Sequence, residues 1–433
     1  MSTSLGIICE NLPEFEPRPL QDIMNAVYNV RAYRTRFDCH KSVVVCPYPP
    51  WRNRSSMAVE QLRHFRYEHL EALAIGAGIL GTGGGGSPYL NKIYVAERLK
   101  GGLEIPVVPV AELEDDAIVA STGGVGAPTV GVERLKEGEE LLRSVRALEK
   151  YTGKQVTHMI SAEIGGGNSI SPIIVAIQAG LPVVDGDGMG RAFPELQMDT
   201  FSIYGIPPTP NAISDIRGHV AIFDHIDDAR DLERYVRTAT VQMGGGTGAT
   251  GPLMSGEQVR RTAVPGTLTF AVLLGEAVLA ARKEHRNAVE AATEVSGGQV
   301  LFTAKITDVD RRFVAGFARG HLTLDGTDND DGRKFSIDFQ NENLVATDET
   351  GDVICSVPDL ICIVDAETAE PISTESLRYG LRVAVLGIPA PRLIATPEAL
   401  EVVGPAAFGY PDVSYRPLSG VYGGKLADLV DQH

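Results

Sequence analysis

The feature that most constrains the fold is an alternation of short apolar runs and longer amphipathic segments between residues 105 and 187. The short runs fit buried strands, and the longer segments repeat their apolar residues at helical spacing. Strand–helix–strand order with apolar strands indicates a parallel sheet covered by helices. We therefore predict a three-layer α/β/α domain with a mainly parallel sheet. The expected strands are 105–110, 117–121, 156–162 and 181–185, and the expected helices are 133–150 and 169–179.

Glycine-rich runs follow several of these elements. Residues 122–129 are TGGVGAPT, residues 163–168 are EIGGGN and residues 185–188 are DGDG. Loops that end parallel strands fall on the C-terminal edge of the sheet, where open α/β sheets bind ligands. A further run, GGGTGATGP over 244–252, is also expected to be a loop.

An earlier run, GTGGGGSP over residues 81–88, follows a predicted helix over 66–81. Ser87 and Pro88 are a typical N-cap and first residue of a second helix. The run lacks the Lys-Ser/Thr of a Walker A loop and the preceding strand of a Rossmann loop, so no nucleotide cofactor is expected. We predict that backbone groups of these loops line a substrate site, through Gly83, Gly84, Gly85, Gly86, Gly124, Gly166 and Gly167.

Three carboxylates and an amide lie at the same predicted edge. Glu163 follows one strand, and Asp185 and Asp187 flank a glycine at the end of another. Burial raises the pKa of such a carboxyl into the range for general acid–base catalysis. Asn168 either caps a helix or donates to a developing negative charge. We predict all four as catalytic residues, and either Glu163 or Asp187 as the base.

Arg191 lies just beyond this pair of aspartates. Its guanidinium either binds a substrate carboxylate bidentately or only neutralises the aspartates. Glu195 and Gln197 follow Pro194 and are further candidates for the substrate site. Asp185 and Asp187 are also the candidates for a divalent metal, although the sequence offers few further ligands.

The pattern changes after Gly297, where short alternating runs are separated by turns at close spacing. This predicts a β-rich, barrel-like domain over 297–433, with a C-terminal tail that folds back. The α/β domain is then 57–296. Residues 1–56 hold three of the five Cys and the only Trp, and we predict a poorly ordered extension or a non-native start there.

Composition excludes several classes of partner. The formal net charge is −17, and no Lys/Arg-rich run is present, so no nucleic acid is expected. No apolar run reaches about 18 residues, so no membrane span is expected, and we infer a cytoplasmic protein. We expect the protein to bind a small-molecule substrate and to form a homo-oligomer.

Several motifs occur in an order that resembles one family. They are GTGGGGSPYL, EIGGGNS, GLPVVDGDGMGRAFPELQM, FQNENL, PDLI, LRYG and GPAAFGY. Together they resemble the S-methyl-thiohydantoin desulfurase family over about residues 57–415. The resemblance implies an α/β domain followed by a β-barrel-like domain, and hydrolysis of the exocyclic C–S bond of an S-methylated thiohydantoin.

Two alternatives to this activity remain open at the level of sequence. One is a hydantoinase- or oxoprolinase-type hydrolase of a cyclic amide, with or without a metal. The other is a non-catalytic subunit that binds a hydantoinase-like partner. The shared fold does not decide among them, because one fold supports many activities.

Overall fold

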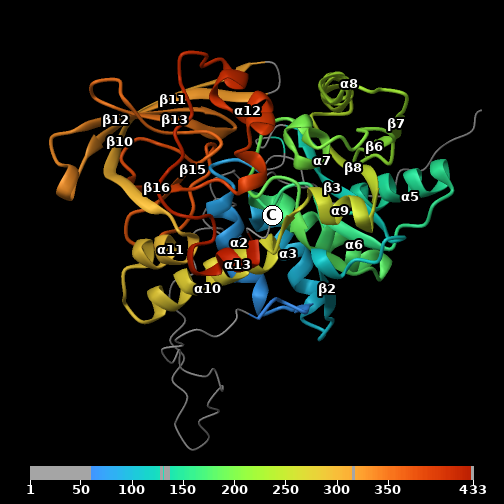
Figure 1. Ribbon diagram of the computed structural model, residues 1–433. Helices are drawn as coiled ribbons and strands as arrows, with labels where there is room; N and C mark the ends of the chain where they lie inside the picture. Colours follow the sequence, from blue (N-terminus) through green and yellow to red (C-terminus); the bar gives the residue numbers. More distant parts are fainter. Residues whose placement is uncertain (1–59, 127–129, 131–136, 315–316, 431–433) are drawn as a thin grey trace, which may run out of the picture. The chain divides into compact units, whose positions relative to one another are not determined.

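Two β-sheets, with helices around and between them, make up the described part of the computed structural model (Figure 1). The described residues are 60–126, 130, 137–314 and 317–430. The predicted extension over 1–56 lies outside them. One sheet uses strands up to Pro265 and the other uses strands from Gln299 onward, so the chain is mixed α/β as predicted.

The first sheet is mixed, with four consecutive parallel strands extended by antiparallel strands on both sides. The strand order is β1-β2-β5-β4-β3-β8-β6-β7, and β9 pairs with β5. Strands β2, β5, β4 and β3 are parallel to one another. The bounds are β1 (His64–Phe65), β2 (Ile105–Pro109), β3 (Ile118–Gly126), β4 (His158–Ser161), β5 (Val183–Asp187), β6 (Asn211–Ser214), β7 (Val220–Phe223), β8 (Gly246–Ser255) and β9 (Val264–Pro265).

Helices cover both faces of this sheet, which explains why its strands are apolar on both sides. Successive side chains of a strand point to opposite faces. Along β5, Val183 joins the core that contains α6, and Val184 joins the core that contains α9. The helices beside this sheet are α3 (Pro88–Leu99), α5 (Glu140–Thr152), α6 (Ser171–Ala179), α7 (Thr200–Ile203), α8 (Ala229–Gln242) and α9 (Gly256–Thr262).

A layer of three helices packs against the two sheets: α2 (His69–Leu80), α10 (Thr267–Lys283) and α11 (Ala288–Ser296). Helix α10 contacts β5 of the first sheet, whereas α2 and α11 contact strands of the second. Helices α2 and α10 approach closely because each presents a glycine to the other. A Cβ on Gly76 would lie 1.8 Å from the Ala271 carbonyl oxygen, and one on Gly275 would lie 1.8 Å from that of Ala72.

The second sheet is wholly antiparallel and curls into a half-barrel. Its order is β14-β13-β12-β11-β10-β16-β15, and its end strands β14 and β15 contact each other without a hydrogen-bonded ladder. This agrees with the predicted barrel-like region. The bounds are β10 (Gln299–Val314), β11 (Phe317–Gly326), β12 (Lys334–Gln340), β13 (Glu342–Asp348), β14 (Val353–Ser356), β15 (Leu360–Asp365) and β16 (Arg382–Ile388).

Two glycine-rich runs predicted as loops form strands over much of their length: residues 122–126 belong to β3 and residues 246–252 belong to β8, whereas residues 127–129 lie outside the described residues. The glycines of β3 and β8 face one another in an antiparallel ladder, with Gly124 opposite Gly248. A Cβ on Gly248 would lie 2.8 Å from the Leu141 amide nitrogen at the start of α5. These glycines therefore allow another backbone segment to pack closely against the strand. From sequence alone, a glycine with this role cannot be distinguished from a glycine in a turn.

Most other elements fall close to their predicted positions. Ser87 caps α3, its side chain accepting from Tyr89 N, with Pro88 at the first helical position, as predicted. Strand β5 begins and ends two residues later than predicted, so it includes Asp187. The short strands β6 and β7 were not predicted. No helix of the described residues is long and apolar enough to cross a membrane.

The last part of the described chain returns to the first sheet and the helical layer. Tyr422 is buried and donates to the Gly190 carbonyl oxygen at 2.7 Å. Its ring also packs edge-on against Phe270 of α10. Two short helices belong to this part, α12 (Pro397–Val403) and α13 (Ala427–Val430).

Candidate functional site

Glu163 lies just beyond the C-terminal end of β4, with its carboxyl group buried. Its Oε1 accepts from Asn168 Nδ2 at 2.5 Å, and its Oε2 accepts from the Phe193 amide at 3.1 Å. Burial raises the pKa of Glu163 to about 7, although these two hydrogen bonds act in the opposite direction. A carboxyl group with this pKa exchanges protons readily near neutral pH.

Asn168 fixes the orientation of that carboxyl group. It lies in the short 3₁₀ helix η2 (Gly166–Ile170), and its Oδ1 accepts from the Gly124 amide at 2.7 Å. With its oxygen bound to β3 and its nitrogen bound to Glu163, the amide bridges two neighbouring strand ends. Ser161 supports the same loop by donating to the carbonyl oxygens of Glu163 and Asn168.

Asp187 ends β5 and organises the loop that follows. Its Oδ2 accepts from the backbone amides of Ile164, Met189 and Gly190, at 2.7, 3.1 and 2.8 Å. Its Oδ1 is buried and has no hydrogen-bond partner among the described residues. Burial raises the pKa of Asp187 to about 7, and the amides of Gly190, Ile164 and Met189 oppose that shift.

Asp185, two residues earlier on β5, accepts hydrogen bonds from groups at the N-terminal end of a helix. Its Oδ1 accepts from the Thr269 amide at 3.0 Å, and its Oδ2 accepts from the Thr269 hydroxyl at 2.6 Å. Both donors lie in the first turn of α10, where a negative charge is stabilised by the helix dipole. Among the described residues, no group of three or more His, Cys, Asp and Glu side chains could hold a metal ion.

Arg191 is fully buried, and all its N–H groups have protein acceptors. Nε donates to Ala192 O, Nη1 donates to the carbonyl oxygens of Pro358 and Asp359, and Nη2 donates to Thr82 Oγ1 and Asn343 O. The side chain therefore joins the loop after β5 to Thr82 in the loop after α2, to the start of β13 and to the turn before β15. In this geometry no N–H group is left for a substrate carboxylate.

Glu342, at the start of β13, brings another buried carboxyl group to the same place. Its Oε1 accepts from the Gly85 amide at 3.3 Å, and its Oε2 has no hydrogen-bond partner among the described residues. Burial raises the pKa of Glu342 well above its usual range, and the charge of Glu163 raises it further. The only sequence signal for it was the cluster of polar residues in FQNENL.

The two loops Gly83–Gly86 and Gly165–Gly167 pack backbone against backbone. Gly167 N donates to the carbonyl oxygens of Gly85 and Gly86, each at 2.9 Å. A Cβ on Gly85 would lie 2.3 Å from Gly165 O, and one on Gly84 would lie 1.8 Å from Glu342 Oε1. The glycines predicted to line the site thus do come together, and they also hold the loops in contact.

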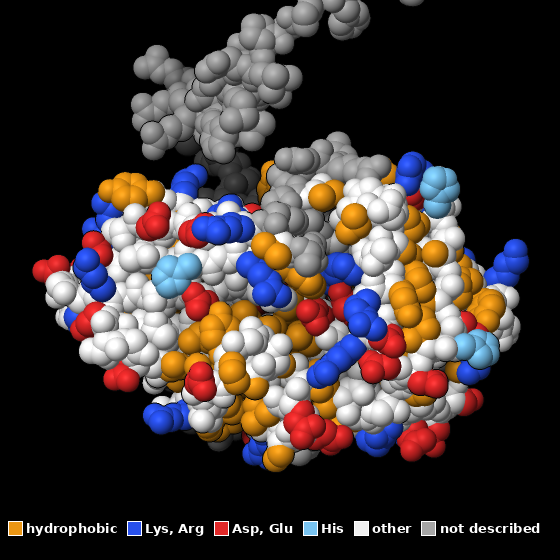
Figure 2. All heavy atoms as spheres, turned by 90° about the horizontal axis from the view of Figure 1, so that it is seen from above, with side chains coloured by type: hydrophobic (Ala, Val, Ile, Leu, Met, Phe, Trp, Pro, Cys, Tyr) orange, Lys and Arg blue, Asp and Glu red, His pale blue; other side chains and the backbone are white. Residues whose placement is uncertain are grey.

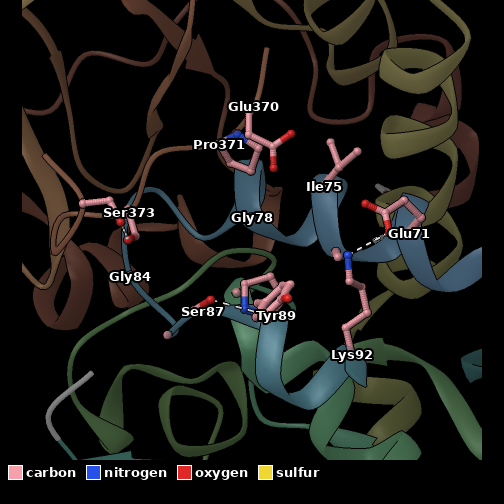
Figure 3. Close-up of a pocket in the computed structure, with 16 residues that line it drawn as sticks. Glu71, Ile75, Gly78, Gly84, Ser87, Tyr89, Lys92, Glu370, Pro371 and Ser373 are labelled. Carbon is pink, nitrogen blue, oxygen red and sulfur yellow. Dashed lines mark hydrogen bonds and ion pairs between the residues drawn. The ribbon is translucent and has the colours of Figure 1, made fainter. Parts of the chain in front are cut away.

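A cavity of about 180 Å³ opens on this pair of loops (Figure 3). Lys92 and Tyr89 of α3 form one wall, and Pro371 and Ser373 face them from the loop before β16. Lys92 Nζ pairs with Glu71 of α2 at 2.7 Å. The cavity is lined by Gly83, Gly84, Gly86 and Gly166 but by none of the predicted catalytic residues, so the loops separate it from the carboxyl groups.

The last two predicted residues lie farther along the chain. The side-chain amide of Gln197 donates to Glu195. Among the described residues, no hydrogen bond joins either side chain to Glu163, Asp185 or Asp187. The surface seen from above in Figure 2 mixes acidic and basic side chains with hydrophobic patches. That face carries no continuous basic area of the kind that binds nucleic acid.

Known proteins were compared with the chain at the levels of sequence and structure. The family model "S-Me-THD-like, N-terminal domain" matches residues 68–225, and "S-Me-THD-like, C-terminal domain" matches residues 226–418. A crystal structure of a protein from Chromobacterium violaceum is similar at 25% identity with a TM-score of 0.69, over 82% of this chain and 99% of that one. No curated protein matched the chain significantly.

Proposed function

We propose that this chain, which belongs to the S-Me-THD-like family because both domain models of that family match it, is a hydrolase of the desulfurase type. The motifs of the sequence indicate the same family. It cleaves the exocyclic C–S bond of an S-methylated thiohydantoin or a closely related heterocycle. The observation that carries this proposal is the buried Glu163 carboxyl group, whose pKa of about 7 suits it to activate water at neutral pH.

The ring carbon that carries the sulfur lies between two nitrogens and is electrophilic. Glu163 takes a proton from water as the water oxygen bonds to that carbon. The C–S bond then breaks, and Glu163 gives its proton to the departing methylthiolate, which leaves as methanethiol. The ring carbon becomes a carbonyl as the hydroxyl proton of the adduct passes to the ring nitrogen. Asn168 keeps Glu163 in position, because its side chain is bound to both Glu163 and Gly124. Asp187 holds the loops around the base.

The substrate first binds in the cavity on the glycine loops, and those loops must part for its ring carbon to reach the buried Glu163. Its polar backbone walls and the ring of Tyr89 suit a small planar heterocycle. An acidic substituent on the ring is assigned to Lys92, whose ammonium group has further N–H groups besides the one paired with Glu71, since the N–H groups of Arg191 are all taken. This assigns Arg191 a structural role and gives Lys92 the anchoring role first considered for Arg191.

The test is release of methanethiol from a series of S-methyl thiohydantoins, with the matching hydantoins as controls. We expect Glu163→Gln to lower kcat by about 10²–10⁴-fold, the usual contribution of a general base. The matched control is Glu149→Gln, a buried glutamate of α5 that accepts from the Val156 amide. Full turnover by Glu163→Gln would remove Glu163 as the base, and hydantoin ring opening without methanethiol would favour the cyclic-amide hydrolase.

A further inference from the structure

Helix α3 holds Lys92 in a defined position beside the two glycine loops. The preceding residue, Asn91, is buried and donates to Gly167 O at 2.9 Å. The helix also starts directly after the first glycine loop, where Ser87 caps it. Tyr89 lies one turn before Lys92 on the same face, and Lys92 Nζ is 5.7 Å from the centre of the Tyr89 ring. These contacts fix the ammonium group in the wall of the cavity.

Among the described residues that line this cavity, three are charged: Glu71, Lys92 and Glu370. Glu370 pairs with Arg282 of α10, with 2.8 Å between Oε2 and Nη2. Glu71 lies in the first turn of α2, and its Oε2 is 2.7 Å from Lys92 Nζ. Figure 3 shows Lys92 reaching from α3 to Glu71 across the space between the two helices. A ligand in the cavity therefore meets the pair formed by Lys92 and Glu71.

The two members of this pair differ in how firmly they are held. The side chain of Lys92 is 21% exposed, whereas that of Glu71 is 58% exposed. An ion pair with an exposed partner contributes little to stability, so Glu71 can share or release the ammonium group at low cost. The ammonium group attracts an acidic group of a ligand, and the carboxylate of Glu71 repels it. The charge of Glu71 therefore sets how strongly the cavity prefers an acidic ligand.

We propose that Glu71 is a specificity-determining residue, which shares the ammonium group of Lys92 with an acidic substituent on the ring of the substrate. The inference rests on the proposed function, because it takes the cavity as the place where the substrate first binds. Glu71 reduces the advantage that Lys92 gives to an acidic substituent over a neutral one of the same size. The cavity accordingly accepts heterocycles with one acidic group or with none, and a second acidic group is repelled by Glu71.

The test measures binding and needs no turnover. The probes are two hydantoins, which carry a carboxymethyl or a carbamoylmethyl group at the same ring position, and calorimetry gives the Kd of each. In Glu71→Gln we expect the acid to bind about fivefold more tightly, because a negative charge beside the ammonium group is removed. In Lys92→Gln we expect the acid to bind about fivefold more weakly, because the attracting charge is removed. The amide should bind all three proteins alike.

The matched control is Glu97→Gln, since Glu97 pairs with Lys100 at the end of the same helix and does not line the cavity. A ratio of the two Kd values in Glu71→Gln equal to that of the control overturns the inference. Failure of both hydantoins to bind the unsubstituted protein overturns it as well. A shifted ratio in a protein that releases no methanethiol supports the inference and removes the desulfurase reaction, whereas methanethiol release with an unshifted ratio does the reverse.

Discussion

At the scale of single residues, the candidate site is a set of buried acids held by backbone amides. The positions of Glu163 and Asp187 could be predicted from sequence because Glu163 follows the end of one parallel strand and Asp187 ends another. The roles of Arg191 and Glu342 could not be predicted. The acceptors of Arg191 include carbonyl groups 167 and 168 residues away, and Glu342 meets Gly85 across 257 residues. Only the packing of the two sheets brings these groups together.

The pKa of Glu163 makes a prediction about stability. Its folded-state pKa of about 7 lies above the usual 4.5, so the folded protein binds the proton more tightly than the unfolded chain. The corresponding stabilisation is complete below about pH 4.5 and is lost as pH rises through about 7. It amounts to about 3 kcal/mol, at about 1.4 kcal/mol for each unit of pKa.

Glu163→Gln mimics the protonated carboxyl group at every pH and should remove this dependence. Urea unfolding of both proteins between pH 4.5 and 8 measures the difference. We expect the free energy of unfolding of the variant to rise relative to the unsubstituted protein as pH increases. A difference that stays constant over that range would show that Glu163 has an ordinary pKa in the folded protein.

At the scale of elements, glycine decides how closely segments approach. The sequence indicated a helix at α2, but it contained no sign that Gly76 of this helix faces Gly275 of α10. The glycine runs of β3 and β8 were predicted as loops because glycine is rare in strands. Both cases depend on contact between residues far apart in the chain, which periodicity within one element does not report.

The contact of α2 with α10 predicts an effect of added volume. A methyl group at Gly76 or Gly275 would overlap a carbonyl oxygen of the other helix, so the helices must separate. We expect each of Gly76→Ala and Gly275→Ala to lower the free energy of unfolding by about 1–3 kcal/mol. Gly101→Ala is the control, since its nearest neighbour would be 3.8 Å away. A free energy of unfolding equal to that of Gly101→Ala would show that α2 and α10 can move apart without loss of stability.

At the scale of the whole molecule, residues 58–433 form one compact unit. The boundary between the two family domains, at residue 225, does not separate the two sheets. Strand β8 follows that boundary and pairs with β3 and β6, which precede it. One core also combines α2 and α10 with Leu360 and Leu386 of the second sheet. The change from an α/β region to a β-rich region was predictable from the sequence, whereas this sharing of a core was not.

This sharing predicts that fragments divided at the family boundary do not fold alone. Residues 58–225 lack β8, and residues 226–433 lack the strands on either side of it. We expect each fragment to lack a cooperative thermal transition by calorimetry, and we expect mixing or co-expression to restore one. The control is the undivided segment of residues 58–433. A cooperative transition in either isolated fragment would contradict the prediction.

The backbone contact between the two glycine loops has an evolutionary consequence. Walls built from main-chain atoms keep their shape when side chains elsewhere are exchanged, so they can be inherited unchanged while the substrate varies. Sequence differences among relatives should then be concentrated on the other walls of the cavity, in α3 and in the loop that carries Pro371 and Ser373. A comparison of related sequences should find the glycines constant and the facing wall variable wherever enzymes of this architecture have acquired different heterocycles.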